Sequence, residues 1–169
     1  MGENVSPSDT DDAKWFHWSG SAMSVIRAAL AEGVAAGHSH TLDPDTRWLG
    51  GATPHRDIIA TVDGRPARRD AKSVRLDNGE VVFARWNAKP FSVIDVDFIT
   101  LVRLGKSTTG FKFDFDARTA TMHAGASIED VWDVPTAAMN ELMPEHGPTQ
   151  PTWRNVKLST EVLEPYRVL

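Results

Sequence analysis

The chain has 169 residues, of which 41% are hydrophobic and 24% are charged, and it contains no cysteine. These values are ordinary for one globular domain with a real core. The lack of cysteine excludes disulfides, thiolate zinc sites and cysteine nucleophiles. No run approaches the roughly 18 apolar residues of a membrane span, and we recognise no signal peptide at the N-terminus. We therefore expect a cytoplasmic or virion-associated protein with no membrane partner.

The net charge of −5 is concentrated near the N-terminus. Residues 1–12 carry four acidic and no basic residues, which leaves a charge of only −1 for the rest of the chain. A nearly neutral body argues against broad electrostatic capture of nucleic acid. Because the polar tail cannot bury enough apolar surface to order itself, we expect a neighbouring chain or its own domain to hold it. We predict an extended acidic arm over residues 1–14 and a single domain over residues 15–169.

The first predicted element is a helix that has Ser21 as its N-cap and ends near Gly37. Its apolar residues recur at helical spacing from Met23 to Val34. We expect the aromatic residues in front of this helix to dock it on the sheet or on a partner. These residues are Trp15, Phe16 and Trp18.

Alternating apolar and polar residues predict a series of strands, because successive side chains of a strand point to opposite faces. The predicted strands are residues 56–62, 71–76, 80–86, 91–104 and 110–122. Asp63-Gly64 and Asp77-Asn78-Gly79 are predicted hairpin turns, since these residues tolerate positive φ. Residues 105–109 are predicted to close a further hairpin.

The last third of the chain predicts a return to helix and then a final strand. Ser127 with Asp130 resembles a capping box, and Pro135 interrupts this helix or starts a second one. A proline-rich loop follows, and residues 153–163 are predicted to form the last strand. The element order predicts an α+β fold. We expect an antiparallel β-meander of five to six strands, an N-terminal helix and a helix near residues 127–143.

The main catalytic candidates are Asp95 and Asp97 on the predicted strand 91–104. Carboxylates two residues apart share one face of a strand and could hold a divalent cation. The run of alternating hydrophobic and Asp residues resembles the metal-binding carboxylates of nucleotidyltransferases and primase-type polymerases. In that case Arg85 or Lys89 would neutralise a phosphate-containing substrate. The competing interpretation places both acids on the wetter face of the strand, or against an arginine.

Two further polar groups are candidate ligand sites. The first group could bind zinc from an irregular loop, and it consists of His38, His40 and Asp43. Alternatively, these residues lie on a surface loop after the helix and bind no metal. The other group is basic, and it could bind phosphate or an acidic segment such as another subunit's N-terminal arm. Alternatively, it is a solvated loop between strands. Its members are Arg65, Arg68, Arg69, Lys72 and Arg75.

With no catalytic motif standing out, we favour a non-enzymatic structural, assembly or partner-binding protein. A virion component or a small inhibitor that uses an extended N-terminal arm fits this description. The chain has six tryptophans, and Trp is favoured at interfaces. The predicted partner-binding residues are Trp15, Phe16, Trp18 and Trp48.

The expected partner is a protein, either further copies of this chain or another protein, and no cofactor is implied. The alternative function is a small metal-dependent enzyme that acts on a phosphate-containing substrate, with Asp95 and Asp97 as metal ligands. Only this alternative requires a small-molecule substrate.

Overall fold

The computed structural model describes residues 20–49, 57–86, 89–114, 117–143 and 153–169. The predicted acidic arm and the aromatic residues Trp15, Phe16 and Trp18 lie outside these ranges. The elements in chain order are α1 (Gly20–Leu42), β1 (Arg47–Trp48), β2 (Ile58–Val62), β3 (Arg65–Asp77), β4 (Glu80–Trp86), β5 (Phe98–Asp114), β6 (Thr119–Pro135), α2 (Thr136–Leu142), β7 (Trp153–Ser159), α3 (Thr160–Leu163) and the 3₁₀ turn η1 (Glu164–Tyr166).

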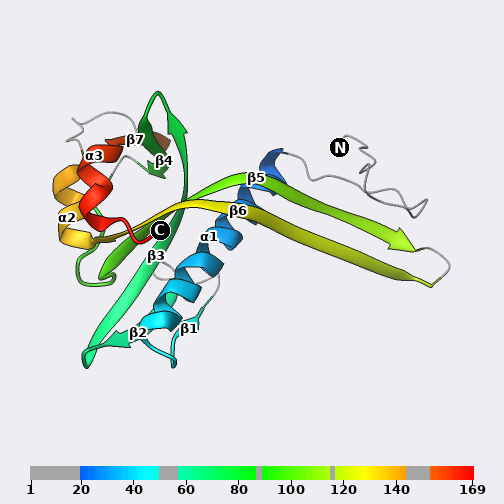
Figure 1. The fold of residues 1–169 in the computed structure, drawn as a ribbon, viewed down its shortest axis with the longest axis horizontal. Helices are drawn as coiled ribbons and strands as arrows, with labels where there is room; N and C mark the ends of the chain where they lie inside the picture. Colours follow the sequence, from blue (N-terminus) through cyan, green and yellow to red (C-terminus); the bar gives the residue numbers. More distant parts are fainter. Residues whose placement is uncertain (1–19, 50–56, 87–88, 115–116, 144–152) are drawn as a thin grey trace.

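The fold is α+β, as predicted, and the described residues form a seven-stranded sheet preceded by α1. One path through the sheet, β1-β2-β3-β4-β7, is antiparallel throughout. β5 joins it parallel to β3 and carries β6 antiparallel on its other side. The parallel pair departs from a simple meander. β3 and β5 run parallel because β4, which lies between them in the chain, runs in the opposite direction (Figure 1).

The two short hairpin turns lie where the sequence predicts them. Asp63 and Gly64 join β2 to β3 with φ angles of 50° and 73°. Asn78 and Gly79 join β3 to β4 with φ angles of 49° and 77°. Positive φ at both central residues is the geometry whose twist matches that of the flanking strands.

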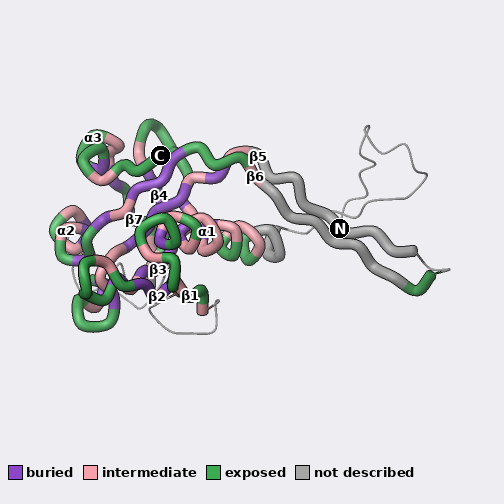
Figure 2. The backbone as a smooth tube through the Cα atoms, turned by 60° about the horizontal axis from the view of Figure 1, so that its bottom comes forward, coloured by how far each residue is buried: buried purple, intermediate pink, exposed green. Residues whose placement is uncertain are grey.

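β5 and β6 are buried on both faces where they cross the body of the protein. Ile99 and Leu101 belong to the core that α2, β7 and α3 complete, whereas Val102 and Leu104 pack with α1 on the opposite face. In Figure 2 the buried stretches accordingly gather in the body, around the strands between these helices. α1 approaches the sheet closely because Ala31 is small and fully buried.

The outer parts of β5 and β6 leave the body as a two-stranded ribbon (Figure 1). β3 pairs with β5 only as far as Arg103. Beyond that residue β5 pairs only with β6 among the described residues, in a register from Ser107↔Ala126 to Asp114↔Thr119. We use the term ribbon for residues 105–114 and 119–126.

The hairpin predicted at residues 105–109 is wrong, and so is a single strand over residues 110–122. Residues 105–109 continue β5, and the chain reverses between Asp114 and Thr119, where Arg118 has a φ of 54°. The apparent turn is a β-bulge, because the register shifts on both sides of Leu104. A bulge and a turn share small, polar residues. The alternating pattern also runs through the true turn without a break.

The predicted helix near residues 127–143 is present only as α2, from Thr136 to Leu142. Residues 127–135 continue β6, because Trp132 and Val134 bury on one face of the sheet and Val131 on the other. α1 runs past the predicted stop at Gly37 to Leu42. The last strand ends early at Ser159, whose hydroxyl accepts a hydrogen bond from the Val162 N–H and so caps α3.

Candidate partner-binding surface

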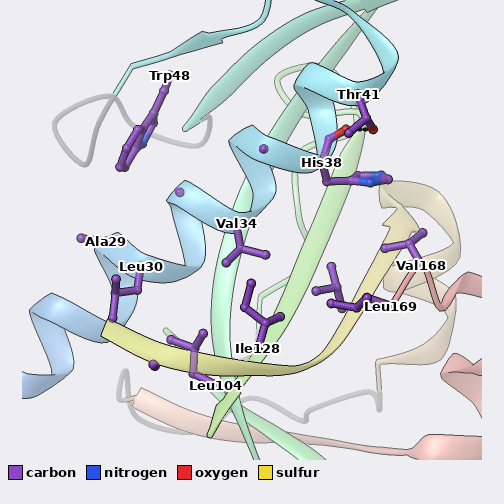
Figure 3. A pocket seen from close by; sticks show the side chains of 14 residues that line it. Ala29, Leu30, Val34, His38, Thr41, Trp48, Leu104, Ile128, Val168 and Leu169 are labelled. Atoms are coloured by element: carbon purple, nitrogen blue, oxygen red, sulfur yellow. Dashed lines mark hydrogen bonds between the residues drawn. The ribbon is translucent and has the colours of Figure 1, made fainter. Parts of the chain in front are cut away.

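An apolar groove of about 740 Å³ lies between α1 and the base of the ribbon (Figure 3). α1 and Trp48 form one side of it, and Val168 with Leu169 at the C-terminal end form the other. Leu104 and Ile128 contribute from β5 and β6. The remaining lining residues are Ala29, Leu30, Gly33, Val34, Gly37, His38, Thr41, Ala126 and Val131.

Small residues on one face of α1 create this hollow. Ala29, Gly33 and Gly37 follow one another at four-residue spacing and therefore lie along the same face of the helix. Trp48 packs on this stripe, since a Cβ added at Gly33 would lie 3.5 Å from the indole ring. The indole N–H donates to Glu32 Oε2 at 3.0 Å. A Cβ added at Gly37 would meet nothing within 4 Å, so the groove is open there.

Large apolar side chains around the groove remain accessible to solvent. Trp48 is 52% exposed, Ile128 44% and Leu169 58%. Grouped apolar exposure of this kind marks interaction surfaces more often than scattered single residues do. Trp48 is therefore the one predicted partner-binding residue that the described part of the chain contains, and it lies in this groove.

The body fixes the base of the ribbon through backbone contacts. Arg27 of α1 donates to the carbonyl oxygen of Leu104 at 2.8 Å and to that of Gly105 at 3.1 Å. Gly105 is also tightly enclosed, because a Cβ there would overlap Ser127 Oγ and the Glu129 carboxylate. The ribbon therefore leaves the body at a bulge held by α1 and by neighbouring side chains of β6.

The groove lies directly at the base of the ribbon. Ala126, which pairs with Ser107 where the ribbon begins, also lines the groove.

Asp95 and Asp97 do not share the face of a strand, because residues 91–97 form turns before β5 begins. Asp97 is engaged by Arg68: its Oδ2 accepts from the Arg68 backbone N–H and from Nε, each at 2.8 Å. Burial tends to raise the pKa of Asp97, but the Arg68 hydrogen bonds outweigh burial and lower it. Asp95 is exposed. The arrangement joins β3 to the start of β5 and does not bring the two carboxylates together as a ligand pair.

The residues predicted to neutralise a substrate also have other surroundings. The Arg85 guanidinium stacks on the Phe91 ring at 3.6 Å and donates to the carbonyl oxygens of Lys89 and Pro90. Burial lowers the pKa of Arg85. The Lys89 residue is exposed. Arg85 is therefore engaged by the backbone at Lys89 and Pro90 and by the Phe91 ring.

The histidine cluster lies within α1 rather than in a loop. Residues two apart on a helix do not face the same way, so His38 and His40 do not converge. Asp43 caps local structure: Oδ1 accepts from the Asp45 N–H at 2.9 Å and Oδ2 from the Thr61 N–H at 2.5 Å. These two backbone hydrogen bonds lower the pKa of Asp43.

Asp133 in β6 is the centre of a buried polar network that the sequence analysis missed. Its carboxylate accepts from Arg69 Nη2 in β3 at 2.9 Å and from Thr100 Oγ1 in β5 at 2.8 Å. His38 Nε2 in α1 lies 3.3 Å from the same carboxylate. The Arg69 side chain is 1% exposed and lies over the Phe98 ring. The network therefore ties four elements together.

The Asp133 carboxylate has a lowered pKa despite its burial. Burial by itself raises the pKa of Asp133, but hydrogen bonds from His38 and Arg69 outweigh burial and hold the pKa at about 2. Removal of one partner would leave the other charge buried and unpaired. We therefore interpret the network as a structural clamp.

The basic cluster is largely neutralised within the body. Three of its members form ion pairs, Arg68 with Asp97, Arg69 with Asp133 and Lys72 with Asp70. The other two members, Arg65 and Arg75, are exposed. The cluster therefore does not present its five charges together to a phosphate or an acidic segment.

A second hollow of about 710 Å³ lies where α1 faces β3 and β4, and its lining mixes acidic and basic residues. Burial raises the pKa of Asp57 there to about 6, with the nearby Asp70 and Glu32 carboxylates adding to the rise. The Ala71 N–H donates to Asp57 Oδ2 at 2.9 Å and opposes the shift. Asp70 accepts from Lys72 Nζ at 2.8 Å. Within the described ranges, no group of three or more His, Asp or Glu side chains is placed to hold a metal ion.

Among the described residues no helix is both long and apolar enough to cross a membrane. Comparisons of the chain with protein-family models, curated proteins and solved structures found no match.

Proposed function

We propose that this chain is a non-enzymatic assembly or partner-binding protein. The observation that supports this proposal is the apolar groove beside α1, whose large side chains remain exposed at the base of the ribbon. A soluble domain that keeps such a surface uncovered gains stability when a partner covers it. The ribbon adds a second attachment element to the N-terminal arm that the sequence predicts.

The base of the ribbon supports the same proposal. An isolated two-stranded hairpin is marginally stable in water, so a long ribbon on a folded body needs something to pack against. Specific contacts hold the ribbon in one direction relative to the body, namely the Arg27 hydrogen bonds and the enclosed Gly105. A ribbon held at one angle presents its surface to a partner without a large ordering cost.

The test is to isolate tagged full-length protein from the organism that produces it and to measure complex mass and composition. The matched variant replaces residues 106–125 by Asn-Gly, which shortens the hairpin and retains the bulge. We expect the full chain to be recovered in a complex of fixed stoichiometry and the shortened chain to be recovered alone. Circular dichroism and thermal melting establish that the shortened chain is folded.

Two outcomes contradict the proposal. One is a full chain that is recovered as a monomer without any stoichiometric partner, and the other is a complex that survives removal of the ribbon. A second variant, Gly37→Leu, tests the groove separately, because it fills an open part of a helix face without a steric clash. If the groove contributes, this variant weakens the complex while the isolated protein remains folded.

For the alternative function, a metal-dependent enzyme, no observation among the described residues is specifically favourable. Asp97 is held by Arg68, and Asp95 is exposed in the preceding turn. We therefore do not develop a mechanism for it.

A further inference from the structure

We infer that the partner of the ribbon is the ribbon of a further copy of this chain. β5 of one copy would lie beside β6 of the next, and a ring of copies would close an antiparallel barrel. This inference rests on the proposed function and names the partner of the ribbon.

Among the described residues, pairing to the body ends at the same level on both edges of the ribbon. On the β5 side, pairing with β3 ends at Arg103. On the β6 side, the C-terminal residues end their pairing at Val131, whose N–H donates to the Leu169 carbonyl oxygen at 3.1 Å. The register places Val102 opposite Val131, so the two ends lie side by side. Outward from there, the described strands pair only with each other.

Open strand edges present backbone N–H and C=O groups that can template another strand. Natural proteins often block such edges with proline, but the sequence has no proline between Pro90 and Pro135. Every residue of the ribbon therefore retains its backbone donor. β5 and β6 also have the same length, 17 residues each, so the two edges offer the same number of residues for pairing.

Strand direction selects a ring of identical copies. β5 runs away from the body and β6 returns, so ribbons that point the same way bring β5 of one copy antiparallel to β6 of its neighbour. One repeated contact then satisfies both edges of every copy. A single added peptide strand, or a two-fold pair of β5 strands, would leave one edge of each ribbon open. Closure into a barrel removes all edges.

Disulfide cross-linking tests this inference in purified full-length protein, because the chain has no native cysteine. One tagged chain carries Thr108→Cys on β5. It is co-expressed with a differently tagged chain that carries Thr119→Cys, Thr121→Cys or His123→Cys on β6. A disulfide forms only between Cα atoms within about 7 Å, so it reports neighbouring strands. Glu161→Cys, at an exposed position in α3, is the control for random collision.

We expect covalent dimers between the two tags for at least one β6 position, none for Thr108→Cys with itself, and a light-scattering mass above that of a monomer. Homodimers of Thr108→Cys without mixed dimers would overturn the ring in favour of two-fold pairing. A monomeric mass without cross-links would overturn self-association altogether. If a complex with a different protein is then still recovered from the source organism, the proposed function stands and only this inference fails.

Hydrogen exchange on the unmodified protein provides a readout that no substitution can disturb. In a ring, the amides of the ribbon are protected on both edges. In a monomer, the amides that point outward exchange freely while their neighbours in the β5–β6 ladder are slower. Such an alternation along residues 106–114 would overturn the inference.

Discussion

The inner and outer parts of β5 and β6 belong to the same two strands but lie in different surroundings. Inside the body, apolar residues occupy both faces of β5, as Leu101 and Val102 illustrate, and helices cover each face. In the ribbon, β5 and β6 pair with each other, and no other described element pairs with their outer edges. The body is therefore stabilised by its own layers, whereas the ribbon keeps strand edges with which a partner can pair.

The polar contacts of the two regions also differ in kind. In the body, Asp133 is buried, has a lowered pKa and is paired with the buried Arg69. At the transition to the ribbon, the contacts are backbone carbonyls that accept from Arg27. The following substitutions test this contrast, from the largest expected effect to the smallest.

Asp133→Ala should have the largest effect, because it leaves the Arg69 guanidinium buried without its partner. Loss of one member of a buried ion pair costs about 3–5 kcal/mol. Urea denaturation measures the change in the free energy of unfolding. Asp95→Ala, which removes an exposed carboxylate, is the control and should change it by less than about 0.5 kcal/mol. Similar values for both variants would show that the clamp does not stabilise the body.

The same residue should produce an acid dependence. Its native pKa of about 2 lies below the ordinary value of 3.8. The stabilisation from ionised Asp133, roughly 2 kcal/mol, is therefore complete above about pH 4 and is lost as the pH falls through 2. Unfolding measured from pH 2 to 6 should show a smaller acid slope in Asp133→Asn than in the parent protein.

Asp57→Asn should stabilise the body at alkaline pH. The native pKa of Asp57, about 6, is above its ordinary value of 3.8, so ionisation destabilises the native state as the pH rises through 6. Because Asp57 is partly exposed, we expect a gain of only about 1 kcal/mol at pH 8 and none at pH 4. Thermal melts at the two pH values measure this difference. An equal effect at both would exclude the ionisation of Asp57 as its cause.

Gly105→Val should destabilise the base of the ribbon by about 1 kcal/mol, because its Cβ overlaps Ser127 and Glu129. Both neighbours are side chains that can move, which keeps the cost small. The direction of the ribbon should change more than the stability, and assembly should suffer more than folding. Melting temperature and complex mass are the two measurements. Unchanged assembly would show that the angle at the bulge is unimportant.

Gly37→Leu should have the smallest effect on folding, and the effect should be favourable. Leucine has a higher helix propensity than glycine by about 0.8 kcal/mol, and space is open at this position. A melting temperature that rises while complex formation falls would separate the groove's role in binding from its role in stability. Gly37→Ala is the matched control, since it raises helix propensity without filling the groove.

Local sequence patterns predicted the parts of the fold that depend on local chemistry. Asp63-Gly64 and Asn78-Gly79 adopt the positive φ angles that their residue types allow. The predicted strand 80–86 coincides with β4, which alternating residues and a turn signal define on their own. Trp48, a predicted partner-binding residue, is exposed where it lines the groove.

Errors occurred where two structures share one local pattern. The bulge at Gly105 was interpreted as a turn because both favour small and polar residues, and the true turn near Arg118 does not interrupt the alternation. Ser127 and Asp130 resemble a helix cap, although β6 pairs with β5 through this region. The choice depends on which strand lies opposite, and a local pattern does not contain that information.

The sequence by itself determined the fold class, the short turns and the alternating residues of the ribbon, because backbone preference and side-chain periodicity act over a few residues. Only the tertiary structure decided that Asp133 is buried against Arg69, that Asp97 binds Arg68, and that a groove opens beside Trp48. Each of these features joins segments that are far apart in the chain. Their energies come from burial and charge pairing, which exist only when the partner segment is in place.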